Sequence, residues 1–344
     1  MDTTAFCQTI KHCLRPFRSH FKIIRGKALP VLLLAAFALC VPLTAYAGSS
    51  YMVNYKNVTG KYAGVEVTGK LPQVQGLPSK LQAEINSRIG EIYTEKVNAA
   101  KEDRAKSLDF AFETKTAPES GVDTLLIETT FTTASSRCEI ESIHFDPVAG
   151  TMVTLNDLLG VNALKLANQV IVQTIAKEPD KYNNNFTGIT DAQSFYVDNQ
   201  TVILVFDDYA IAPGAVGTVQ IPIQISEVKN FVISHDQVHT KDDYYALKMI
   251  PLRNVCEEFG WKVDWNASTK TIDITRGNVF ASLTLEENRY YRGKMAARTL
   301  ESAPELRNGV TYAPITFFDE ILGLTYGVDA ATGDITFSEY IAKE

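Results

Sequence analysis

An internal repeat in the last third of the chain constrains the fold more than any other feature. Residues 250–274 and 313–337 align without a gap at an offset of 63 positions. Self-similarity at a fixed offset indicates two copies of one supersecondary unit. The matching positions include a proline, a glutamate and a glycine in each copy: Pro251 and Pro314, Glu257 and Glu320, and Gly260 and Gly323.

Each copy predicts a helix followed by a β-hairpin. The proline begins the helix at its first position, where its missing N–H costs nothing, and the glycine ends it. Hairpin turns are expected at 266–270 and 329–333. Neither unit can bury its apolar face alone, so we expect both copies to share one domain. The apolar residues at i, i+3 and i+7 are Leu252, Val255 and Phe259 in the first copy, and Ile315, Phe318 and Leu322 in the second.

The segment between the copies predicts two further hairpin elements. Residues 279–285 and 289–294 are typical of paired strands, and Asn308-Gly309 is a strong signal for a type I′ turn. A polar connector is expected at 229–241. The C-terminal module is therefore placed at 242–344.

The preceding region, 51–228, predicts a second α+β module. A helix is expected from Ser79, and another after Asn156 or Asp157 that ends before Pro179. Strand-like segments alternate irregularly with these helices. The fold class we expect is α+β, with two modules that are each a mainly antiparallel sheet packed with helices. The inward-facing residues of the two helices are Leu81, Ile85, Ile89 and Ile92, and Leu159, Leu166, Val170 and Ile171.

The first 47 residues have the pattern of a secretory signal peptide. A basic segment precedes an apolar run, and Ala45-Tyr46-Ala47 supplies small residues before a cleavage site at Gly48. The apolar stretch is also long enough to remain as a membrane anchor. In both cases the body of the protein is expected outside the cytoplasm, whether secreted, periplasmic or bound to the cell wall.

Removal of residues 1–47 makes the chain strongly acidic. Lys plus Arg falls from 33 to 27 and Asp plus Glu from 40 to 39, which leaves a net charge of about −12. We expect no remaining Lys/Arg cluster and therefore no nucleic-acid partner. Only Cys138 and Cys256 remain, and they form either one disulfide between the modules or two buried thiols.

Three motifs place residues 242–344 close to a known family. They are Pro251-Leu252-Arg253, residues 260–266 (Gly-Trp-Lys-Val-Asp-Trp-Asn) and residues 308–314 (Asn-Gly-Val-Thr-Tyr-Ala-Pro). The module resembles the copper amine oxidase N-terminal-like domain, a stalk domain of secreted bacterial proteins. That resemblance implies a sheet wrapped around helices. It does not imply amine oxidation, which in that family needs a quinone and three copper-binding histidines in a separate domain.

Residues 51–228 resemble the extracellular domain of lysozyme-binding anti-sigma factors, which also precedes the catalytic domain of some peptidoglycan deacetylases. No deacetylase or sigma-binding domain is expected in this chain. The residues that carry the resemblance are 71–77 with Asn86, Phe145-Asp146-Pro147, 154–159, Phe195-Tyr196-Val197 and 209–217.

Residues that suggest catalysis have a simpler interpretation in each case. His235 and His239 have metal-ligand spacing on a helix, but a solvated connector is favoured. Cys138 and His144 suggest a thiol and its base, but no oxyanion motif accompanies them. The adjacent carboxylates Asp207-Asp208 and Glu286-Glu287 are expected on the surface, because neighbours on a strand or turn point apart. Cys256 is expected in the core.

Two sets of residues are candidates for binding. Trp261, Trp265, Tyr290 and Tyr291 offer flat rings for stacking on a glycan, although a core role is the alternative. Residues 209–217 form a Pro/Gly loop with apolar side chains, and loops on a rigid scaffold often carry recognition. The partner-binding candidates in this loop are Tyr209, Ile211, Pro213 and Val216.

These features predict an exported, non-catalytic cell-envelope protein that binds peptidoglycan, another envelope glycan or an envelope protein. The first alternative is a membrane-anchored sensor or inhibitor of a cationic protein such as lysozyme. The second is an envelope hydrolase with an unrecognised site. We expect no cofactor and no metal, and contact with the membrane only through the N-terminal segment.

Overall fold

The computed structural model describes residues 51–183, 185–241 and 247–341. These residues form two compact units. The first contains the described chain up to Val153 together with Val172–Ile223, and the second contains Thr154–Ile171 and the chain from Gln224 onward. The predicted leader, residues 1–47, lies outside the described residues. Within the described part, no helix is both long and apolar enough to cross a membrane.

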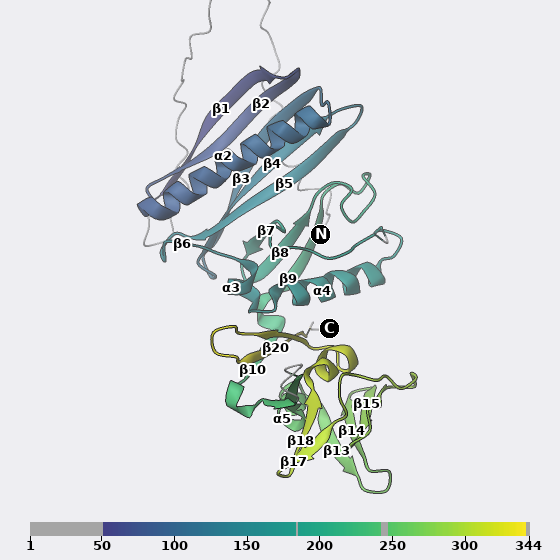
Figure 1. The fold of residues 1–344 in the computed structure, drawn as a ribbon. Helices are drawn as coiled ribbons and strands as arrows, with labels where there is room; N and C mark the ends of the chain where they lie inside the picture. Colours follow the sequence, from purple (N-terminus) through teal and green to yellow (C-terminus); the bar gives the residue numbers. More distant parts are fainter. Residues whose placement is uncertain (1–50, 184, 242–246, 342–344) are drawn as a thin grey trace, which may run out of the picture. The chain divides into compact units, whose positions relative to one another are not determined.

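The first unit is built on a six-stranded sheet in the order β1-β2-β3-β4-β5-β6 (Figure 1). Its neighbours pair antiparallel except β2 and β3, which run parallel. A parallel pair needs a crossover, and α2 (Ser79–Glu102) provides it between those two strands. The strands are β1 (Met52–Tyr62), β2 (Val65–Gln75), β3 (Ser107–Ala117), β4 (Val122–Thr132), β5 (Ser136–Asp146) and β6 (Thr151–Met152).

Both faces of this sheet are covered. The predicted stripe of α2, Leu81 to Ile92, is buried in one core with Leu108 and Phe131 of the sheet. On the other face, Leu126 and Ile140 pack against Val205. A strand covered on both faces is buried at successive positions rather than at alternating ones. β4 is buried without a break from Thr124 to Thr129, although Thr124, Glu128 and Thr129 are polar. The strands of the covering sheet, in order, are β7 (Phe195–Asp198), β8 (Thr201–Phe206) and β9 (Val219–Gln224).

The second unit holds three small sheets around one core. Its sheets have the orders β10-β20-β19, β11-β12-β18-β17 and β13-β14-β15-β16. The elements are α3 (Leu155–Leu159), the start of α4 (Ala163–Lys177), η2 (Ile225–Glu227), β10 (Val228–Ile233), η3 (His235–Gln237), β11 (His239–Lys241), β12 (Leu247–Pro251), α5 (Leu252–Glu258), β13 (Lys262–Asn266), β14 (Thr271–Arg276), β15 (Val279–Thr284), β16 (Tyr290–Arg292), β17 (Glu305–Arg307), β18 (Val310–Pro314), η4 (Phe317–Ile321), β19 (Thr325–Val328) and β20 (Ile335–Tyr340).

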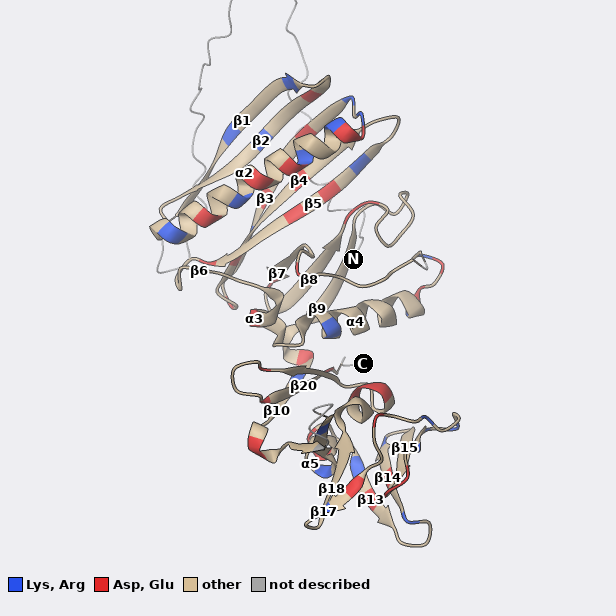
Figure 2. Cartoon of the chain, viewed as in Figure 1, with Lys and Arg blue, Asp and Glu red and all other residues tan. Residues whose placement is uncertain are grey.

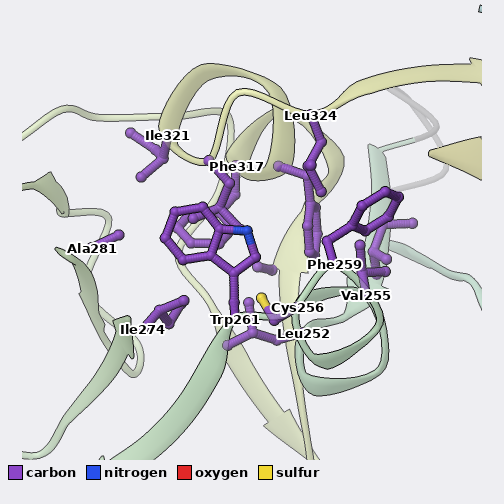
Figure 3. Packing of buried hydrophobic residues seen from close by; sticks show 14 of the residues in the cluster. Leu252, Val255, Cys256, Phe259, Trp261, Ile274, Ala281, Phe317, Ile321 and Leu324 are labelled. Atoms are coloured by element: carbon purple, nitrogen blue, oxygen red, sulfur yellow. The ribbon is translucent and has the colours of Figure 1, made fainter. Parts of the chain in front are cut away.

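The two repeats share this core, as predicted. Figure 3 shows side chains of both copies around Trp261, including Leu252 and Val255 from the first and Phe317 and Leu324 from the second. Strands β12 and β18 pair so that Ile250 lies opposite Ala313, its repeat equivalent. The copies are therefore related by an approximate two-fold axis that passes by this pair of residues.

The hairpin turns of the two repeats have equivalent hydrogen bonds. Asn266 Oδ1 accepts the N–H groups of Ser268 and Thr269 at 3.1 and 3.3 Å. Asp329 Oδ1 accepts the equivalent N–H groups, of residues 331 and 332, at 2.7 and 3.2 Å. Asn308 and Gly309 have φ of 50° and 78°, as the predicted type I′ turn requires. The α+β class is confirmed, and these turns were predicted correctly from local sequence.

Several boundaries differ from the prediction. Pro251 precedes the first helical residue instead of beginning the helix. Pro78, not Ser79, precedes α2. Thr154 caps α3 in a capping box with Asp157, and Gly160, with φ of 90°, separates α3 from α4. Each shift is one to three residues, because the cap depends on backbone angles that composition alone does not fix.

The prediction of a polar connector at 229–241 is wrong. Strand β10 pairs with β20 over six positions, and β11 pairs with β12. The partner of β10 lies far along the sequence, so β10 needs no apolar periodicity of its own to become a strand. Residues Thr154–Ile171 also group with the second unit rather than the first. Asn162 contributes to that grouping, since its Nδ2 donates to the carbonyl of Thr336 at 2.8 Å.

Candidate functional site

The best candidate site is the recognition loop, residues 207–217, which connects β8 to β9 in the first unit. Its base is fixed to the edge of β5. Asp207 Oδ1 accepts the N–H of Ile140 at 2.7 Å, and Asp208 Oδ2 accepts the N–H of Cys138 at 2.9 Å. The N–H of Asp208 returns a bond to the carbonyl of Cys138 at 3.1 Å. Two adjacent carboxylates therefore replace a neighbouring strand along this edge.

The start of β7 completes the cover of the same edge. Ser194 Oγ donates to the carbonyl of Ile140 at 2.6 Å, and the N–H of Phe195 donates to Ser142 Oγ at 3.1 Å. The ring of His144 stacks on that of Phe195 with centroids 3.5 Å apart. Side-chain and backbone groups thus satisfy the free edge of β5 and hold the strands that carry the loop.

Asp207 is half-buried, and this position raises the pKa of its carboxyl. Burial raises the pKa of this carboxyl to about 6, and the hydrogen bond from Ile140 opposes the shift. Glu139 and Glu141 raise the pKa further, whereas Lys96 lowers it. Since Lys96 Nζ already lies 3.0 and 2.8 Å from those two glutamates, it neutralises Asp207 only in part. The charged residues of α2 and β5 are visible in Figure 2.

The loop itself presents apolar groups on a constrained backbone. Tyr209 has φ of 70°, which non-glycine residues rarely adopt, and its side chain is 54% exposed. A Cβ on Gly214 would lie 2.1 Å from the Tyr209 ring, so the ring rests on this glycine. Pro213 is also exposed, while Val216 is partly covered. The N–H of Val216 bonds to the carbonyl of Pro213 at 2.9 Å and closes the turn.

Of the four loop residues predicted to bind a partner, three are at least partly accessible. Ile211 is only 3% exposed and anchors the loop from inside, and its carbonyl accepts the N–H of Asn183 at 2.8 Å. Tyr209, Pro213 and Val216 remain candidates for contact. A rigid, exposed apolar surface of this kind is suited to contact with another macromolecule.

Asp207 and Asp208 are half-buried instead of fully on the surface as expected, because both carboxylates accept N–H groups of β5. Their roles could have been found from the sequence only by knowing that β5 has a free edge. Glu286 and Glu287 are exposed, as expected.

The four aromatic residues do not form one glycan platform. Trp261 and Tyr290 are buried in the second unit, so neither offers a free ring face. Cross-strand pairing aligns Trp265 with Ile272, Leu283 and Tyr290, which places all four on the core-facing side of the sheet. Tyr291 pairs with Ser282 and points to the opposite side. Trp265, at 51% exposure, extends past the core alone.

The two histidines with metal-ligand spacing are not brought together around an ion site. The backbone N–H of His235 bonds to Asp334, whereas the ring of His239 contacts Arg307 and lies 3.3 Å from Glu305. Across the residues that the structure describes, no group of three or more His, Cys, Asp or Glu has a geometry suited to a metal ion.

Cys138 and His144, considered as a thiol nucleophile and its base, also lie far apart. Cys138 and His144 are six residues apart on β5, about 20 Å at strand spacing. His144 Nε2 bonds to the carbonyl of Phe195 at 2.8 Å, and burial lowers the pKa of its ring to about 4. Cys138 and Cys256 are both buried thiols, and no disulfide joins them. Burial raises the pKa of the Cys256 thiol, which occupies the core as predicted.

The sequence interpretation missed one accessible group of residues. Arg289, Arg292, Lys294 and Arg298 are all exposed within one hairpin of the second unit. The expectation that no Lys/Arg cluster remains after residue 47 is therefore wrong. Four basic residues among ten positions were the signal that would have revealed it.

Two segments of the chain match known families. Residues 245–337 match the copper amine oxidase N-terminal domain. That match contains both repeats, and it confirms the resemblance of the C-terminal module. Residues 156–226 match DUF3298, a family of proteins of unknown function. The recognition loop lies inside this second match.

Similar proteins were found among curated sequences and solved structures. A protease inhibitor of Brevibacillus choshinensis is 43% identical over 86 residues, which are 24% of this chain and 26% of that protein. The chain thus spans about a quarter of the length of this relative. A DUF3298-family crystal structure from Bacteroides fragilis is 14% identical with a TM-score of 0.35, over 52% of this chain and 91% of that one. Another, from Pseudomonas aeruginosa, is 11% identical with a TM-score of 0.36, over 52% and 90%.

Proposed function

We propose that this chain is an exported, non-catalytic cell-envelope protein that binds peptidoglycan or an envelope protein through the recognition loop. The observation that carries the proposal is the exposed apolar surface of Tyr209 and Pro213, held on a base that Asp207 and Asp208 fix to β5. Binding by a rigid loop avoids much of the entropy cost of ordering a flexible one.

A second candidate is an inhibitor or sensor of a cationic envelope protein such as lysozyme. Two observations favour it. The curated relative from Brevibacillus choshinensis is named a protease inhibitor, which supports an inhibitory role. The net charge of about −12 after residue 47 would also attract a cationic partner. The resemblance to the extracellular domain of lysozyme-binding anti-sigma factors supports the same candidate.

The test uses residues 48–344, which contain every helix and strand that the structure describes. The protein is sedimented with purified peptidoglycan sacculi and, separately, co-eluted with lysozyme at increasing salt. The loop variant is Tyr209→Asn with Pro213→Ser, because asparagine tolerates the positive φ at position 209. The control is Tyr62→Thr, which removes an exposed tyrosine from β1 in the same unit.

The proposal predicts binding to sacculi or to lysozyme that the loop variant loses and the control keeps. Salt-sensitive binding to lysozyme alone would favour the inhibitor. Absence of binding to both, by a chain with an intact unfolding transition, would contradict the proposal.

A further inference from the structure

The second unit carries a basic hairpin, residues 289–298, that neither the core nor the recognition loop uses. Its ends are paired, since Tyr290 and Arg298 exchange backbone hydrogen bonds at 2.9 and 2.8 Å. The sequence from Asn288 to Leu300 contains no acidic residue. In a chain with a net charge of about −12 after residue 47, this is a local reversal of charge.

Two of its cations are available to an external anion. Among the described residues, no carboxylate forms an ion pair with Arg292 or Lys294. Arg298 lies 3.5 Å from Glu320 in an exposed pair, which contributes little. The Arg289 guanidinium lies 5.8 Å from the ring of Tyr291, on the outer side of the sheet. The Arg298–Glu320 pair lies at the base of the hairpin, where Arg298 bonds to Tyr290, and not at its tip.

An exposed apolar side chain accompanies these two cations. Met295 follows Lys294 at the tip and is 59% exposed. The N–H of Gly293 bonds to the carbonyl of Phe280 at 2.7 Å, which fixes the tip beside that strand. Phe280 and its neighbour Val279 are 39% and 40% exposed. The tip thus combines two positive charges with the exposed side chain of Met295. Val279 and Phe280 are neighbours on β15 and point to opposite faces of the sheet beside it.

We infer that the basic hairpin docks on the surface of an anionic phospholipid bilayer. Lys and Arg are attracted to lipid phosphates, and apolar side chains beside them gain free energy by entering the interface. A soluble phosphate polymer would use the cations but leave Met295 in water. The presence of both groups at one tip therefore favours the lipid surface. The inference is independent of the recognition loop, which lies in the other unit.

The acidic remainder of the chain does not prevent this contact at physiological salt. Screening confines charge interactions to about 8 Å there, so the hairpin responds to the membrane through its own charges. Higher salt should therefore weaken the attraction, while burial of Met295 is unaffected by screening.

The experiment is cosedimentation of residues 48–344 with vesicles, since the apolar run before residue 48 would itself bind lipid. Vesicles of phosphatidylcholine alone are compared with vesicles that also contain phosphatidylglycerol. The test variant is Arg292→Glu with Lys294→Glu. The control, Lys56→Glu with Lys80→Glu, makes the same change in net charge at exposed positions of the first unit. A third variant, Met295→Ser, removes only the apolar group, and soluble polyphosphate serves as the competing anion.

We expect binding to the phosphatidylglycerol vesicles only, more than about tenfold weaker in the hairpin variant, and unchanged in the control. Met295→Ser should weaken vesicle binding and leave polyphosphate binding unchanged. Equal binding to neutral vesicles, or equal loss in the control, would overturn the inference. Vesicle binding that Met295→Ser leaves intact and polyphosphate abolishes would also overturn it, in favour of a phosphate polymer.

Discussion

Arg276 and Glu339 each lie two residues beyond the end of a repeat, at equivalent positions, and form a bidentate ion pair with each other. The offset between them is the 63 residues of the repeat, and their two N–O contacts are both 2.6 Å. The pair therefore lies across the same approximate two-fold axis as Ile250 and Ala313. Arg276 also covers Trp261, with its guanidinium 4.4 Å from the ring, and donates to the carbonyl of Phe259. One ion pair thus joins the two copies above their shared core.

This geometry predicts that the two charges can be exchanged. Arg276→Glu or Glu339→Arg alone should lower the free energy of unfolding by about 2 kcal/mol, because each leaves two like charges in contact. The double exchange should recover part of that loss, because it restores the ion pair but not the contacts of Arg276 with Trp261 and Phe259. Urea unfolding of the three variants measures this. Losses that simply add in the double variant would show that the pair is not interchangeable.

The approach of β2 to β3 predicts a severe effect at Gly69. Its φ is 126°, and a Cβ there would lie 2.1 Å from the carbonyl oxygen of Phe110. Gly69→Ala should therefore cost about 3 kcal/mol or more. Gly90→Ala is the matched control in α2, where a Cβ meets nothing within 4 Å. That control should raise stability by about 0.5–1 kcal/mol. Similar effects at both positions, measured by thermal unfolding, would contradict this packing.

The raised pKa of Asp207 predicts a specific pH dependence. The folded carboxyl binds a proton with a pKa of about 6, against 3.8 as the ordinary value. The folded state thus holds the proton more tightly, and the stability from this group falls as the pH rises between those values. Asp207→Asn keeps the acceptor for Ile140 and removes the charge.

That variant should match the wild type near pH 4 and exceed its stability by about 2 kcal/mol near pH 7. Urea unfolding at both pH values checks the difference. A variant that is less stable at neutral pH would show that the ionised carboxylate supports the fold.

The sequence predicted local structure well and tertiary pairing less well. The repeat, its turns and the buried stripe of α2 follow from periodicity and from residues with special backbone angles, such as Gly309. The strand character of 229–241 did not follow, because β10 is specified by its partner β20 rather than by its own pattern. The inward turn of Asp207 and Asp208 depends in the same way on the free edge of β5.

The same distinction between local sequence and tertiary pairing applies to the candidate sites. The loop at Tyr209 was predictable, because Pro and Gly with apolar neighbours mark a shaped and accessible turn. The glycan platform was not, because the faces of Trp265 and Tyr291 depend on the register of four strands. The basic hairpin was visible in the sequence as a local density of Arg and Lys. Composition averaged over the chain concealed it.

The most direct test of the account is hydrogen–deuterium exchange of residues 48–344 with and without soluble peptidoglycan fragments, and with and without lysozyme. The proposed function predicts that one of these partners slows amide exchange within residues 207–217, while exchange along β1 is unchanged. A partner that binds but slows exchange only in other segments would contradict the assignment of this loop as the contact surface.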